Sequence, residues 1–201
     1  MCNLYRLDVP ANQIADAFGI DAGSDPWAGD YVAPGKYAPV VVRADGQKVM
    51  VPRVWGVPPP PNGDRPVTNV RNLDSPFWIG TLRHTMFRCL IPVTSFQEWG
   101  GERGRRTQHW FSVPSEPVFA IAGIWRDSEV ASFAMLTTDP NPLVEAVHPK
   151  AMPVILGSSL EADRWLSAYG AGAAVMQRPY PDEAMIEVDI AEPPPAQPSL
   201  F

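Results

Sequence analysis

The chain is poor in cysteine and has no long apolar run. Its two cysteines, Cys2 and Cys89, are too few for a disulfide framework. No segment approaches the roughly 20 apolar residues of a membrane helix. The N-terminus lacks the charged, apolar and small-residue regions of a signal peptide. We therefore expect a protein that is neither stabilised by disulfides nor inserted in a membrane, and that works in the reducing cytoplasm.

The chain has fewer basic than acidic residues, with 16 Lys and Arg against 22 Asp and Glu, and its net charge is -6. This balance argues against nucleic-acid binding, because affinity for phosphates comes mainly from Lys and Arg. The distribution of the charges argues the other way, since six arginines fall in one stretch: Arg71, Arg83, Arg88, Arg103, Arg105 and Arg106. One basic face on an acidic protein is consistent with both observations.

Histidine is scarce too, and the three histidines, at positions 84, 109 and 148, have no metal-ligand spacing with either cysteine. The glycines at 100, 101 and 104 do not link a strand to a helix, so they do not indicate a nucleotide-binding loop. We expect neither a metal nor a cofactor.

The composition suits one domain, with 45% hydrophobic residues in 201. We predict a domain over residues 2–190 and a proline-rich, extended tail over 191–201. Strands outnumber helices without regular β-α alternation, which is typical of an α+β fold, here mainly an antiparallel, barrel-like sheet with a few short helices. We expect a monomer.

The predicted helices start or stop at proline, serine and glycine signals. They are Pro10–Gly19, Asp74 or Ser75 to Arg83, Asn141–His148 and Leu160–Tyr169. The predicted strands are 2–7, Tyr37–Arg43, Lys48–Val57, Cys89–Pro92, Ser95–Trp99, His109–Val113, Val118–Arg126, Ser132–Thr138, Pro153–Leu156 and Met185–Ile190. Ala44-Asp45-Gly46-Gln47 predicts a hairpin turn between the second and third strands.

Cys2 would become the N-terminal residue after Met1 is removed, because the aminopeptidases that remove methionine act when the second residue is small. An α-amino group titrates near 7.7–8.0, so part of it is neutral at pH 7, and its thiol neighbour titrates near 8.5. Such a pair condenses with an aldehyde to an imine, which the thiol closes into a five-membered thiazolidine. On position alone, Cys2 is better explained as a small residue early in a strand.

Several short motifs occur in the order found in one known family. They are Met-Cys-Asn-Leu-Tyr-Arg at the start, Val32-Ala33-Pro34-Gly35, Val54-Trp55-Gly56, Asn69-Val70-Arg71, Arg88-Cys89-Leu90-Ile91-Pro92 with Phe96-Gln97-Glu98-Trp99, Phe119-Ala120-Ile121-Ala122-Gly123-Ile124-Trp125, and His148-Pro149-Lys150-Ala151-Met152-Pro153. This order resembles the SOS response-associated peptidase (SRAP) family, whose members crosslink to abasic sites in single-stranded DNA. The resemblance runs from residue 2 to about residue 166.

The resemblance implies roles for four residues: Cys2 as nucleophile, Asn69 as the site asparagine, Glu98 as catalytic acid and His148 as catalytic histidine. Partial burial beside Trp99 would raise the pKa of Glu98 and suit it to proton transfer. His148 would protonate the oxygen that leaves the opened sugar or assist reversal of the link. Without the resemblance, these three partners of Cys2 read as a turn asparagine, a surface carboxylate and a packed or capping histidine.

The resemblance also marks residues for contact with the DNA: Arg71, Thr137, Lys150, Pro34, Trp55 and Arg88. A flanking phosphate would suit Arg71. The family often places a tryptophan where this chain has Asn62, and we expect Trp55 or Trp78 to supply the stacking surface instead. A family glutamate is replaced by Leu73, and the histidine loop is one residue longer than its commonest form. The crosslinking residues are retained, but the groove for DNA is expected to differ.

Two other functions fit parts of the sequence. An amidohydrolase of the glutaminase type also begins at a processed Cys2, but it needs an ammonia-using partner domain that 201 residues cannot hold. A non-catalytic module for single-stranded DNA would use only the arginine cluster, and its binding would survive Cys2→Ala. The family name adds proteolysis, including self-removal of Met1.

The end of the chain, Gln197-Pro198-Ser199-Leu200-Phe201, resembles the Gln-x-Ser/Asp-Leu-Phe peptides that bind the bacterial replication sliding clamp. An exposed Leu-Phe pair on a polar tether is costly to leave in water, so we expect it to occupy a groove on a partner or on its own domain. Clamp binding would bring the protein to the nucleoid, at single-stranded gaps in stalled forks.

Overall fold

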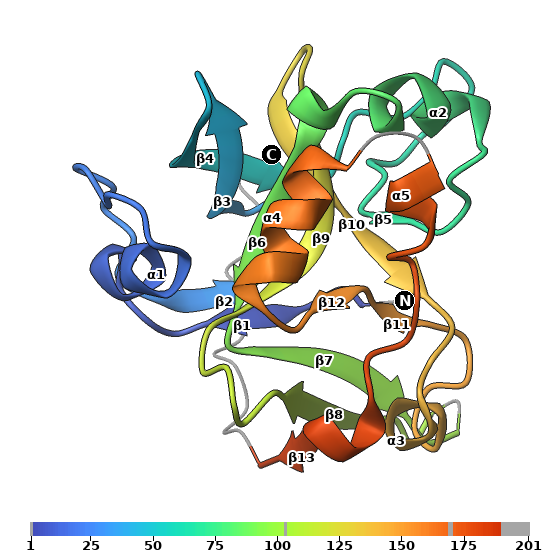
Figure 1. The fold of residues 1–201 in the computed structure, drawn as a ribbon. Helices are drawn as coiled ribbons and strands as arrows, with labels where there is room; N and C mark the ends of the chain where they lie inside the picture. The colour runs from blue at the N-terminus through green and yellow to red at the C-terminus, as the bar shows by residue number, and fades with distance from the viewer. Residues whose placement is uncertain (1, 103, 169–170, 190–201) are drawn as a thin grey trace.

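A computed structural model describes residues 2–102, 104–168 and 171–189. The strands form two sheets, with the helices outside them (Figure 1). The smaller sheet contains, in spatial order, β13 (Ile186–Val188), β8 (Thr107–Ser112), β7 (Ser95–Gly100), β1 (Tyr5–Leu7) and β2 (Asp30–Val32). The larger sheet contains β11 (Met152–Pro153), β10 (Ala131–Thr138), β4 (Gln47–Trp55), β3 (Tyr37–Ala44), β6 (Arg88–Val93), β9 (Phe119–Asp127) and β12 (Ile155–Leu156), with β5 (Asn69–Val70) beside β10.

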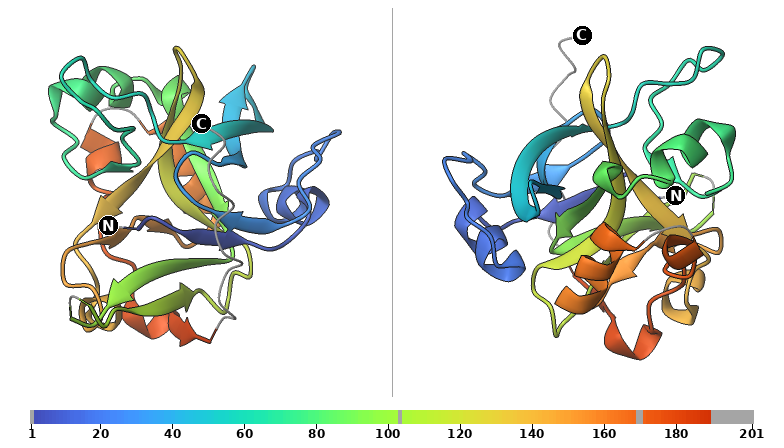
Figure 2. Two further views of the ribbon diagram at one scale, coloured as in Figure 1. Left: turned by 180° about the vertical axis from the view of Figure 1, so that it is seen from behind. Right: turned by 45° about the horizontal axis from the view of Figure 1, so that its top comes forward.

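The larger sheet curls so that its pairings close into a ring. β10 pairs with β4, β4 with β3, β3 with β6 and β6 with β9, and β9 pairs back to β10. The smaller sheet stays open and lies beside this ring (Figure 2). The mixed α+β fold is therefore as predicted, but the sheets together do not form one clean barrel.

Local signals account for the elements that match their predictions closely. At the turn between β3 and β4, Asp45 (φ 49°) and Gly46 (φ 79°) both adopt the left-handed conformation that a tight two-residue hairpin requires. The first helix, α1 (Ala11–Phe18), ends at Gly19 with φ 62°. The next, α2 (Pro76–Leu82), starts with proline, and the Ser75 hydroxyl accepts a hydrogen bond from the backbone N–H of Phe77.

Some predicted elements differ in extent from the structure: the strands predicted for 2–7 and 185–190 are the shorter β1 and β13. The helix predicted for 141–148 is the single turn α3 (Pro142–Glu145). The strand predicted for 153–156 is divided, because β11 pairs with β10 whereas β12 pairs with β9. Between them the N–H of Val154 donates to the carbonyl of Leu136, and its carbonyl accepts from Ala122. The chain therefore crosses from one strand to the other at Val154.

The remaining elements are short: the 3₁₀ turns η1 (Thr85–Phe87) and η2 (Asp182–Ala184), and the helix α5 (Ala171–Ala174). The longer helix α4 (Ser159–Ser167) covers β6 and β9 (Figure 1). Its Trp165 is fully buried, and the indole N–H donates to the carbonyls of Cys89 and Gly123. In the described part of the chain, no helix is long and apolar enough to cross a membrane. The tail predicted from residue 191 lies outside the described residues.

Arg88 is a buried cation at the start of β6, and its side chain has no exposed surface. Its guanidinium donates to the carbonyls of Trp165, Ala168 and Leu82, and it stacks over the Trp165 ring at 4.9 Å. Trp165 lies in α4, Ala168 directly follows α4 and Leu82 ends α2. The Arg88 side chain therefore joins β6 to both α2 and α4. The prediction that Arg88 contacts DNA is wrong for this structure, because the guanidinium faces the interior.

We predict that Arg88→Met lowers the free energy of unfolding by about 3 kcal/mol, because buried carbonyls lose their donors. Urea denaturation measures the change. Arg83→Ala serves as the control, since Arg83 lies close by in the chain but is exposed, and it should change stability by less than about 0.5 kcal/mol. Equal stability of Arg88→Met and the unchanged protein would show that these hydrogen bonds do not support the fold.

Candidate active site

Four segments bring together the residues for which the sequence predicts a catalytic role. Cys2 precedes β1, Asn69 begins β5, Glu98 lies in β7 and His148 follows α3. Because β1 pairs with β7, the N-terminal segment runs beside Glu98. Because β5 pairs in parallel with β10, Asn69 lies beside the carboxyl half of β10, and the start of β1 is seen next to that end (Figures 1 and 2).

Cys2 is enclosed, with 1% of its surface exposed in the chain that includes Met1. Its thiol donates to the carbonyl of Leu4 at 3.4 Å. Burial raises the pKa of the thiol well above its usual range, and the nearby Glu98 raises it further. The thiol is therefore neutral in this conformation, and it is held next to a carboxyl group.

Asn69 holds the backbone of Cys2. Its side-chain amide donates to the carbonyl of Cys2 at 3.0 Å and to the hydroxyl of Thr68 at 2.9 Å. The other side-chain atom, the buried Oδ1, accepts no hydrogen bond from the described residues. A buried acceptor without a partner costs free energy, so this oxygen is available to a hydroxyl or amine of a ligand.

Glu98 and His148 form the acid–base part of the cluster. The Glu98 side chain is 1% exposed, and Oε2 lies 3.7 Å from Nε2 of His148. Burial raises the pKa of Glu98 to about 7, while burial lowers the pKa of His148, as do the charges of Lys150 and Arg106. Glu98 therefore changes charge close to neutral pH, where it can give or take a proton, and the lowered pKa of His148 favours its neutral imidazole, which can accept one.

The backbone around His148 is fixed by packing and by a cap. The Asn141 side chain accepts from the N–H of Val144 and donates to the carbonyl of Tyr180, which anchors α3 to the C-terminal segment. The N–H of His148 donates to the carbonyl of Val144 at 2.7 Å. Val147 packs so closely on Gly100 that a Cβ there would lie 3.0 Å from its methyl group. The glycine therefore lets the histidine loop approach β7.

The residues that the sequence assigns to DNA contact do not all reach the surface. Arg71, Lys150 and Pro34 are exposed. Thr137 is fully buried, and its hydroxyl donates to the carbonyl of Val70 at 3.4 Å. For the side chain of Thr137 the prediction of a DNA contact is therefore wrong in this structure.

Trp55, proposed as a stacking surface for a base, is fully buried as well. Its ring stacks on Phe133 at 6.3 Å and tilts against Tyr5 at 5.2 Å, and its indole N–H donates to the carbonyl of Thr68. Trp78, the alternative, is 4% exposed. Neither ring offers a face to a base, so both stacking predictions are corrected. Trp55 instead supports the segment that leads to Asn69.

Most of the chain matches one protein family. The SOS response associated peptidase (SRAP) family matches residues 1–192. The chain belongs to this family. The order of motifs in the sequence indicated the same assignment.

Individual relatives agree with this assignment. The SRAP chain is 28% identical, over 191 residues, to the abasic site processing protein YoqW of Bacillus subtilis strain 168 and to its counterpart in Bacillus phage SPbeta, covering 83% of this chain and 80% of each relative. Among solved structures, a protein from Bordetella bronchiseptica has a TM-score of 0.78 at 19% identity over 95% of this chain and all of its own. One from Bacteroides thetaiotaomicron has a TM-score of 0.75 at 20% identity over 92% and 90%. These structures share the fold.

Two residues beside the SRAP site have no signal in the sequence. The Gln177 side-chain amide donates to the carbonyls of Arg71 and Thr137, at 2.7 and 2.8 Å, and so ties the ends of β5 and β10 together. Asp139 forms an ion pair with Arg71. Both contacts join residues far apart in the sequence, 106 positions for Gln177 and Arg71, so no local pattern signals them. No group of three potential metal ligands occurs among the described residues.

We predict that Glu98 contributes stability that is lost as pH rises from about 4.5 to 7. The raised pKa of Glu98 means that the folded SRAP chain holds a proton that the unfolded chain releases, so deprotonation favours unfolding. Glu98→Gln should remove roughly 1–3 kcal/mol of this loss. Urea denaturation across this pH range measures it, with the exposed Glu145→Gln as a control that keeps the slope. The same slope for Glu98→Gln and the unchanged chain would contradict the burial effect.

Proposed function

We propose that this protein processes abasic sites in single-stranded DNA by linking covalently to them through Cys2 after Met1 is removed. The observation that carries the proposal is the enclosed cluster of Cys2, Asn69, Glu98 and His148, in which a thiol and two proton-transfer groups meet. Membership of the SRAP family and the name of the YoqW relatives, abasic site processing protein, support the DNA-damage substrate.

The reaction uses both groups of the N-terminal cysteine. An abasic sugar in its open form carries an aldehyde at C1. The neutral amine of Cys2 adds to this carbon, and loss of one water gives an imine. The sulfur then adds to the same carbon while the imine nitrogen takes a proton, which closes a thiazolidine. The product contains the protein and the DNA less one water, and no oxidant or metal is needed.

Glu98 supplies and removes the protons in this sequence. In its protonated form it donates to the hydroxyl that leaves as water, and as a carboxylate it takes the proton of the neutral thiol when the sulfur adds. Its pKa of about 7 keeps both forms populated. His148, whose Nε2 lies 3.7 Å from the Glu98 carboxyl group, exchanges protons with it and protonates the ring oxygen when the closed sugar opens. Asn69 accepts a hydrogen bond from a sugar hydroxyl through its open Oδ1.

Access to Cys2 is the condition that the proposal must meet. In the chain that includes Met1, Cys2 is 1% exposed, so the thiol cannot meet a nucleotide in that form. Removal of Met1 creates the free amine that the reaction requires. Self-cleavage of the bond between Met1 and Cys2, with Glu98 and His148 as the acid and base, would account for the peptidase in the family name.

An amidohydrolase and a non-catalytic module for single-stranded DNA remain the alternatives. Both leave the chain without a covalent sugar adduct. Only the module keeps its full affinity for DNA when Cys2 is replaced, because it would rely on exposed cations such as Arg71 and Lys150.

We predict that the mature protein forms a heat-stable adduct with single-stranded DNA carrying an abasic site, and that Cys2→Ala abolishes it. The mass of the adduct should equal that of protein and DNA less one water. Cys2→Ser tests the ring closure, because it keeps the amine and should form only an imine that hydrolyses on heating unless it is reduced. The matched control is Cys89→Ala, at the other buried cysteine. An unchanged yield from Cys2→Ala would remove the proposal.

We also propose that the last five residues, Gln197–Phe201, bind the replication sliding clamp and so bring the protein to the nucleoid. We predict that a peptide of the last 12 residues binds a purified bacterial clamp and that replacing Leu200 and Phe201 by alanine removes binding. Fluorescence anisotropy of the labelled peptide measures it. A peptide with no affinity for the clamp would remove this part of the proposal without affecting the crosslinking site.

A further inference from the structure

The ends of β5 and β10 form the edge of the site where Arg71 lies. The two strands are parallel, with Asn69 opposite Met135 and Val70 opposite Leu136. In a parallel pair, both chains leave the sheet at the same end. Arg71, just after β5, and Asp139, just after β10, are therefore carried to the same side, and their side chains form an ion pair.

Gln177 fixes this edge from the other side. The side-chain amide of Gln177 donates hydrogen bonds to the carbonyls of Arg71 and Thr137. These hydrogen bonds join the ends of β5 and β10 beyond their last paired residues. The backbone that carries the Arg71 side chain is thus held at a defined position. The Arg71 side chain is 41% exposed and the Asp139 side chain 79% exposed, so a ligand from solvent can approach both.

We infer that Asp139 is an internal competitor of DNA: its carboxylate holds the Arg71 guanidinium in the free protein and must give way to a backbone phosphate when DNA binds. This inference rests on the proposed function, because it assigns a DNA phosphate to Arg71. Asp139 is then a specificity-determining residue. It weakens non-covalent binding to every DNA strand, so that the covalent step selects the DNA that carries an abasic site.

The energetics agree with such a role. An exposed carboxylate–guanidinium pair contributes little to stability, so it is easily exchanged. A phosphate group also binds arginine by charge-assisted hydrogen bonds. The phosphate can take the guanidinium only when the Arg71–Asp139 ion pair breaks, and this loss lowers the net affinity for DNA. Removing the carboxylate should therefore increase affinity for DNA without touching Cys2, Asn69, Glu98 or His148.

The test uses equilibrium binding to a single-stranded oligonucleotide with a tetrahydrofuran residue, an abasic mimic that has no aldehyde and cannot be crosslinked. We expect Asp139→Asn to lower the dissociation constant about two- to fivefold at low salt. The gain should shrink as salt increases, because screening weakens the competition. The melting temperature should stay the same.

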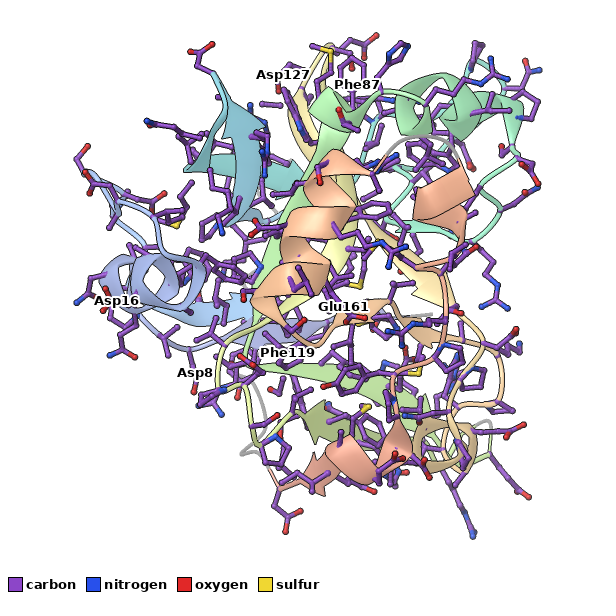
Figure 3. The ribbon with its side chains drawn as sticks, in the orientation of Figure 1. Asp8, Asp16, Phe87, Phe119, Asp127 and Glu161 are labelled. Carbon is purple, nitrogen blue, oxygen red and sulfur yellow. The ribbon has the colours of Figure 1, made fainter. Side chains whose placement is uncertain are left out.

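Asp127→Asn is the matched control. Asp127 also pairs with an arginine, Arg53, at 3.0 Å, and is also exposed, but it lies at the far end of β9, at the top of Figure 3. This exchange removes the same charge from the protein and should leave DNA affinity unchanged. A gain equal to that of Asp139→Asn would mean that net charge alone sets affinity and would overturn the inference.

A double-mutant comparison separates competition from simple repulsion. In an Arg71→Ala background, Asp139→Asn should have no effect, because there is no guanidinium left to release. The same gain with and without Arg71 would show that Asp139 only repels DNA, and would overturn the inference. If no variant binds the oligonucleotide while the aldehyde-bearing DNA still crosslinks, Asp139 has no role but the proposed function stands. Loss of both binding and crosslinking would remove the proposed function.

Discussion

The burial of Glu98 next to Cys2 is the constraint on which the rest of the site depends. Glu98 lies in β7, which pairs with β1 on one side and β8 on the other, and its side chain is 1% exposed. Removing a carboxylate from water costs free energy unless it is neutralised or paired. Protonation of Glu98 lowers this cost, and so does His148, whose Nε2 the loop after α3 holds 3.7 Å from the Glu98 carboxyl group. The same desolvation that weakens the fold near neutral pH gives the site its acid–base group.

Both sheets position the residues of this cluster. The ring of β3, β4, β6, β9 and β10 supplies the support, and the buried rings of Trp55 and Phe133 stack on each other in two of its strands. The open sheet supplies the reactive edge, with Cys2 at its start and Glu98 in its middle strand. Asn69 connects the two, since it lies in the strand beside β10 and donates to the carbonyl of Cys2. The buried thiol and amide are thus positioned before any substrate arrives, which reduces the entropy that the reaction must overcome.

Local chemistry predicts much of the fold and long-range contacts decide the rest. Asp45-Gly46, Ser75-Pro76 and Gly19 specify their turns and caps within a few residues, and these elements lie where the sequence places them. The split between β11 and β12 depends on which distant strand each half meets, and the two-residue β5 has no pattern of its own. The motif order indicated Cys2, Asn69, Glu98 and His148, which the fold brings together. It failed for Trp55, Thr137 and Arg88, because a motif does not state whether a side chain points inward.

The identity of the linked residue tests the central claim most directly. After crosslinking to abasic DNA and nuclease trimming, tandem mass spectrometry of protease fragments locates the sugar remnant. The remnant should lie on an N-terminal fragment that begins at Cys2, with both the amine and the thiol blocked to acylating and alkylating reagents. A remnant on a lysine or on Cys89, or an adduct on a chain that still begins with Met1, would contradict the account.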